Sequence, residues 1–151
     1  MFNTIPNMKP ILLGLITALS LTCATYAGPS VTGTWSVTMQ AAQHEFNFGV
    51  GQFFDATATL VIEREQKSPN PQMATVFSGY FMYSTSPTRL PLSGVARGLQ
   101  VRATFDGGVL EGTLSGLKRG LYRRMTFTSI VPQGNGLYNS QFALAGIAVR
   151  P

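Results

Sequence analysis

Few side chains in this sequence could carry acid–base or metal chemistry. His44 is the only histidine, and no second one can join it in a metal site or a nucleophile pair. Glu63 and Glu65 would lie on one face of a strand, about 7 Å apart from the rise per residue. Two carboxylates at that spacing could serve an inverting glycosidase. They stand at the polar end of a strand beside a Lys-Ser-Pro loop, so we expect a solvated strand end. His44 is expected to be a loop residue.

Aromatic side chains form a second group, which could bind a ligand by desolvation. Residues 40–55 contain four phenylalanines with glycines between them: Phe46, Phe48, Phe53 and Phe54. Part of this segment alternates like a strand, and we predict the rest as a long aromatic loop. The loop could cover an apolar cavity whose wall includes Trp35, Phe105 and Phe127. Alternatively, the phenylalanines fill the open end as core, since burying each is worth about 1.5–3 kcal/mol without any ligand.

Basic side chains form a third group. Lys118, Arg119, Arg123 and Arg124 are the densest basic cluster, in a chain of net charge +5. They could bind an anionic partner such as lipid headgroups. Equally, they could be solvent-facing charges that blunt the edges of a sheet. We expect no nucleic-acid partner, because the aromatic residues of a base-stacking platform are not interleaved with these charges.

The N-terminal segment has the layout of a secretory signal. Residues 11–21 are an apolar run preceded by Lys9 and followed by Thr25-Tyr26-Ala27, and the run is shorter than the ~20 residues that a membrane span needs. We expect cleavage after Ala27, so that residues 1–27 are a signal peptide and residues 28–151 one secreted or periplasmic domain. Met8 could equally be the true start. No transmembrane segment is expected in the mature chain.

The chain's one cysteine falls inside this predicted signal. Cys23 follows Ser20-Leu21-Thr22, whereas a lipidated cysteine usually has Gly or Ala immediately before it and Leu three residues back. We therefore expect no lipoprotein. The mature chain would then contain no cysteine, which excludes disulfides and thiolate chemistry from it. We expect no metal, no cofactor and no catalytic residue.

The elements that must position these groups are β-strands. From Val31 to Met39 apolar and small polar residues alternate, with Trp35 on the apolar face, which is the period of a half-buried strand. The same rhythm returns in residues 56–63, 99–105, 110–116 and 125–131, while residues 73–83 are apolar on both faces. Asp106-Gly107 and Gly134-Asn135-Gly136 predict tight hairpin turns.

We count about eight strands, with no helix long enough for a parallel crossover. The predicted fold is all-β: an antiparallel up-and-down β-barrel, which removes the free edges of so many strands. A flattened sandwich is the alternative. Inward-facing glycines (Gly33, Gly79, Gly112 and Gly146) suit tight bends where a sheet curls.

Gly33-Thr34-Trp35 resembles the Gly-x-Trp start of the calycin barrels, which include lipocalins, fatty-acid-binding proteins and avidins. The resemblance implies an eight-stranded barrel and a basic residue near the last strand that packs over the tryptophan, a role for which Arg150 is placed. Avidins line their biotin site with several tryptophans, and Trp35 is the only one here. The Thr-Asp-Tyr segment of lipocalins is also missing. The resemblance therefore concerns architecture and implies no particular ligand.

Three functions remain open. The first is a ligand-binding barrel, in which a small apolar or amphipathic molecule rests against Trp35 and the phenylalanines, oriented by Tyr80, Tyr83 or Gln100. The second is a non-enzymatic envelope module that binds a protein or an anionic surface through the basic cluster. The third is a barrel enzyme that acts by shaping an apolar substrate, which would need few catalytic groups.

Overall fold

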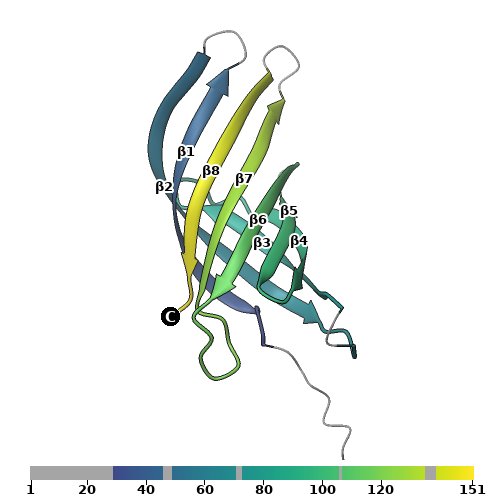
Figure 1. Cartoon of the computed structure of the whole chain (residues 1–151). Helices are drawn as coiled ribbons and strands as arrows, with labels where there is room; N and C mark the ends of the chain where they lie inside the picture. The colour runs from purple at the N-terminus through teal and green to yellow at the C-terminus, as the bar shows by residue number, and fades with distance from the viewer. Residues whose placement is uncertain (1–28, 46–48, 71–72, 106, 135–138) are drawn as a thin grey trace, which may run out of the picture.

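The computed structural model describes residues 29–45, 49–70, 73–105, 107–134 and 139–151, and these form eight antiparallel strands. The strands are β1 (Gly33–Glu45), β2 (Gly49–Gln66), β3 (Thr75–Tyr83), β4 (Leu90–Arg97), β5 (Gln100–Phe105), β6 (Gly108–Ser115), β7 (Arg124–Gly134) and β8 (Asn139–Val149). Each strand pairs with the next, and β8 pairs with β1 (Figure 1). The predicted up-and-down barrel is confirmed, and its closure excludes the sandwich. The described residues contain no helix that is long and apolar enough to cross a membrane.

Alternation of apolar and polar residues determines which face of each strand is buried. On β1, Trp35, Val37 and Met39 are buried, and the residues between them are exposed. Most of the predicted inward residues of β5, β6 and β7 are buried in the same way: Val101, Ala103, Phe105, Leu110, Leu114, Met125, Phe127 and Val131. Leu99, which the same alternation placed inward, is instead exposed, because it lies in the β4–β5 turn before β5 begins. In β3, whose inward face could not be assigned from sequence, Phe77 and Phe81 are the buried side chains.

A close approach of two strands requires glycine at position 79. A Cβ atom on Gly79 would lie 1.8 Å from the carbonyl oxygen of Val61 on β2. The register between β2 and β3 shifts between Ile62 and Arg64, in the same region. An inward-facing glycine therefore stands where the backbones of β2 and β3 approach closely, beside the shift in their register.

The two ends of the barrel differ, and we call them the base and the mouth. The base carries Pro29, the C-terminus and the β2–β3, β4–β5 and β6–β7 connections. The mouth carries the other four connections. Strands β1, β2, β7 and β8 extend further toward the mouth than β3 to β6, as Figure 1 shows. Their extended parts form what we call the tall wall.

The long aromatic loop predicted for residues 40–55 is wrong. β1 continues to Glu45 and β2 begins at Gly49, so these residues form most of a hairpin in the tall wall. The two strands pair through Gln40↔Asp55 and Ala41↔Phe54, and after a register shift between Ala42 and His44 they pair again at His44↔Val50. Continued pairing satisfies backbone N–H and C=O groups that a loop would leave to water.

Candidate functional site

Trp35 is the central side chain of the base. It is completely buried, and its indole Nε1 donates a hydrogen bond to the Val31 carbonyl at 3.2 Å. The guanidinium carbon of Arg150 lies 4.6 Å from the centroid of its ring, within the range of a cation–π interaction. The inward position of Trp35 and the packing of Arg150 over it are confirmed.

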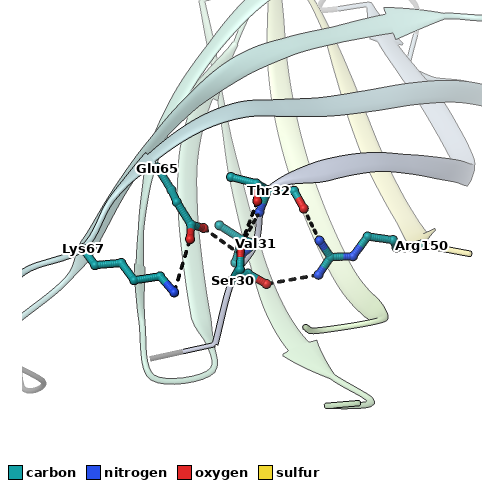
Figure 2. Close-up of polar contacts among 6 residues, drawn as sticks. All are labelled: Ser30, Val31, Thr32, Glu65, Lys67 and Arg150. Carbon is teal, nitrogen blue, oxygen red and sulfur yellow. Dashed lines mark hydrogen bonds and ion pairs between the residues drawn. The ribbon is translucent and has the colours of Figure 1, made fainter. Parts of the chain in front are cut away.

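The donors of Arg150 are used inside the protein. Nε donates to the Tyr122 carbonyl at 2.9 Å, Nη2 to the carbonyls of Ser30 (3.0 Å) and Tyr122, and Nη1 to the Thr32 carbonyl. Figure 2 shows the guanidinium facing the backbone at Ser30 and Thr32. Burial lowers the pKa of Arg150, as does neighbouring Arg123, while Glu65 opposes the shift. Arg150 therefore ties the entering chain and the β6–β7 connection to the C-terminus, and it does not face a ligand.

Gly33 makes room for this arrangement. Its φ of +129° is a conformation that other residues rarely adopt, and a Cβ atom there would lie 3.2 Å from Arg150 Nη1. The Gly-x-Trp spacing thus has a physical reason, because the glycine admits the arginine that covers the tryptophan two residues later.

Glu65 also belongs to the base, and the expectation that it is a solvated strand end is wrong. Its Oε2 accepts a hydrogen bond from the Val31 amide at 2.9 Å, and its Oε1 lies 3.3 Å from Lys67 Nζ (Figure 2). Glu63 is exposed, as expected. His44 lies in β1, where it pairs with Val50 and Gln141, so the expectation that it is a loop residue is wrong. Its side chain lies outside the described residues. Among the side chains that the structure describes, no three His, Cys, Asp or Glu residues cluster as metal ligands.

The barrel interior next to Trp35 is filled. The space there amounts to about 10 Å³, bordered by side chains that include Trp35, Leu60, Phe77, Leu110 and Met125. That is about the space of one water molecule. Above them, the rings of Phe81 and Phe105 pack with centroids 4.9 Å apart. This part of the barrel is a core and has no room for a ligand.

A larger cavity of about 370 Å³ lies toward the mouth. The inner face of the tall wall forms much of it, and the end of β3 borders it. Phe54 and Phe142 meet edge to face in its wall, with ring centroids 6.1 Å apart. The lining residues are Ala41, Phe54, Asp55, Ala56, Thr57, Tyr83, Thr85, Val131, Phe142 and Leu144. The cavity is therefore mainly apolar, with a few polar groups.

The structure separates the aromatic residues that were predicted to act together. Phe54 lines the mouth cavity, but Phe53 points outward and is 74% exposed. Trp35, Phe105 and Phe127 are buried in the core. Phe46 and Phe48 lie outside the described residues.

The three polar residues proposed to orient a ligand are also separated. Tyr83 lines the mouth cavity. The ring of Tyr80 packs against Arg89, whose guanidinium carbon lies 4.6 Å from the ring centroid. Gln100 is exposed at the first position of β5, by the base.

Sequence reasoning missed most of the cavity lining. Ala41, Ala56, Val131, Phe142 and Leu144 were not singled out, although they follow the apolar alternation of their strands. The alternation shows which residues face inward, but not how far the neighbouring strands extend. Position above or below the filled core decides whether an inward residue borders a cavity.

The predicted basic cluster lies at the base, at the opposite end from the mouth cavity. Lys118 and Arg119 are exposed in the β6–β7 connection, and Arg124 is exposed at the start of β7. Arg123 is half-buried, and its Nε atom has no hydrogen-bond partner.

Comparisons with protein-family models, with curated protein sequences and with solved structures find no match to this chain.

Proposed function

We propose that this protein binds a small apolar or amphipathic molecule in the mouth cavity. The observation that carries the proposal is a cavity of about 370 Å³ above a filled core. Its volume falls in the range of small-molecule sites, roughly 300–1,000 Å³. Its lining is apolar over Ala41, Phe54, Phe142 and Leu144, so the release of water from these surfaces would drive binding.

A few polar groups would orient the ligand. Tyr83 and Thr85 border the cavity beside β3. An amphipathic molecule would place its apolar part between Phe54 and Phe142 and its polar part toward these side chains. Trp35 would take no direct part, because the filled core lies between it and the cavity.

We also propose that the chain is a calycin-like barrel. The stacking of Arg150 on Trp35 supports this, as does the space that Gly33 leaves for the arginine.

The test is a substitution that fills the cavity with a larger side chain. Its effect is measured on the binding of N-phenylnaphthylamine, a neutral dye whose fluorescence emission rises in apolar surroundings. Ala41 is buried and lines the cavity, whereas Ala143 is exposed on the outer face of the adjacent strand β8. We expect Ala41→Phe to weaken dye binding at least about tenfold, because the ring occupies the ligand's space. Ala143→Phe makes the same change outside and should leave binding unaltered.

Two results would contradict the proposal. One is that the wild-type protein does not raise the emission of the dye. The other is that Ala41→Phe and Ala143→Phe bind the dye equally well. Phe54→Ala, at a partly exposed position, gives a second test if Ala41→Phe folds poorly, and it should weaken binding by removing the edge-to-face partner of Phe142.

A further inference from the structure

The exposed positive charge of the barrel gathers at its base. Among the described residues, five basic side chains are exposed there: Arg64, Arg97, Lys118, Arg119 and Arg124. Glu63 is the exposed acidic residue near them, while Glu65 is held by Lys67 and the Val31 amide. At the mouth, the charged side chains described are Asp55 and Arg89, one of each sign. The base therefore presents a positive potential that the mouth does not.

Large apolar side chains are exposed among these charges. Met73, Leu99 and Leu117 are 63%, 52% and 57% exposed, and each belongs to a different connection at the base. Met73 and Leu117 border one hollow of about 290 Å³, together with Gly98, Lys67 and Tyr122. The three apolar side chains thus project from neighbouring connections at one end of the barrel.

Arg119 is presented by a tight, hydrogen-bonded turn. Lys118 and Leu121 exchange backbone hydrogen bonds of 2.9 and 3.0 Å, which leaves a two-residue loop. Both loop residues have positive φ, +51° at Arg119 and +73° at Gly120, as in a type I′ turn. Asn or Asp is the usual residue at the first of these positions, and an arginine there is strained. The strained position holds a charge at the tip of the connection.

We propose that the base of the barrel docks on a bilayer that contains anionic lipids. Lys118, Arg119 and their basic neighbours would face the headgroups, where each contributes electrostatic attraction. Met73, Leu99 and Leu117 would enter the interfacial region, in the way that apolar side chains anchor peripheral proteins. Separate apolar side chains on loop tips fit a fluid interface better than a flat, rigid protein surface.

Pro29 borders the hollow at the base, so the mature chain enters the barrel at the end that would face the bilayer. Docking through the base would leave the mouth cavity facing away from the bilayer, so the inference goes beyond the proposed ligand binding and does not depend on it.

The test is co-sedimentation of the exported protein with vesicles of phosphatidylcholine containing about 30 mol% phosphatidylglycerol, compared with pure phosphatidylcholine. We expect binding to the anionic vesicles only, and weaker binding as salt is raised. Lys118→Gln with Arg119→Gln should lower partitioning about 25-fold. Arg119→Gln alone should lower partitioning about fivefold, whereas Arg89→Gln removes one charge at the mouth and should change it less than about twofold.

A second pair of variants tests the apolar contribution. Leu117→Ser should lower partitioning about fivefold. Ile130→Ser changes a side chain of nearly equal exposure, 59% against 57%, on the outer wall of β7, and should have no effect. Equal losses in Arg119→Gln and Arg89→Gln, or equal binding to both kinds of vesicle, would overturn the proposal. If Lys118→Gln with Arg119→Gln lost binding and Leu117→Ser did not, the proposal would also be overturned, and an acidic protein surface would be indicated as the partner.

Discussion

Arg150 shows how one residue can join three separate parts of this chain. Its guanidinium lies over Trp35 and donates to backbone carbonyls at Ser30, Thr32 and Tyr122. A buried charge is costly unless it is fully hydrogen-bonded. Here the carbonyls supply acceptors and the indole supplies the face of a π system, so the charge is compensated without a carboxylate in direct contact.

Arg150→Lys should lower the free energy of unfolding by about 2–4 kcal/mol, because an ammonium group cannot reach all three carbonyls and does not stack as a plane. Denaturant unfolding measures the change. Arg124→Lys, at an exposed position of β7, is the matched control and should stay within about 0.5 kcal/mol of wild type. A similarly small effect for Arg150→Lys would show that the network adds little stability.

At the scale of the elements, strand length is the feature that creates the candidate site. β2 has 18 residues and β3 has 9, and their pairing begins only at Ala58↔Tyr83. Beyond that point the inner face of β2 has no strand of the barrel on one side of it. The short β3–β6 side and the tall wall together leave the mouth cavity above the core.

The turn at the base offers a prediction about an element. Arg119→Asn should raise the free energy of unfolding by about 0.5–1 kcal/mol, because asparagine tolerates the positive φ of a type I′ turn better than arginine. Arg102→Asn makes the same change in the extended strand β5 and should not stabilise the protein. Thermal or denaturant unfolding distinguishes them. Arg119→Asn should nevertheless weaken vesicle binding, which would separate the stability of the turn from its proposed use.

At the scale of the whole molecule, the barrel has two unlike ends. The mouth has a mainly apolar cavity, and the base has exposed basic and apolar side chains around a hollow. The filled interior next to Trp35 lies between them. Distant sites without shared partners usually contribute independently.

The two proposed activities should therefore be separable. Ala41→Phe should weaken dye binding and leave vesicle partitioning unchanged. Lys118→Gln with Arg119→Gln should weaken vesicle partitioning and leave dye binding unchanged. Both quantities can be measured on the same preparations, in separate assays. If either variant altered both activities to a similar extent, the two ends would be coupled or the variants would be misfolded, and far-UV circular dichroism would identify misfolding.

The sequence by itself determined that the chain folds as antiparallel strands and which face of β1, β5, β6 and β7 is buried, while the closure of the barrel and the inward face of β3 came from the structure. Alternation along Trp35, Val37 and Met39 is a local property, because successive side chains of a strand point to opposite faces. The turn residues are local too, which is why Gly107 lies between β5 and β6 and the Lys118–Leu121 turn lies between β6 and β7. Local patterns could therefore place Trp35 in the core before any contact was known.

Only the tertiary structure decided where the inward residues lie along the barrel. Phe54 borders a cavity and Phe105 is packed in the core, although both alternate inward on strands. The difference comes from the register of each strand against its neighbours and from their unequal lengths, which are non-local properties. In the same way, Met73, Leu99 and Leu117 are far apart in the sequence and meet at the base because alternate connections of an up-and-down barrel return to one end.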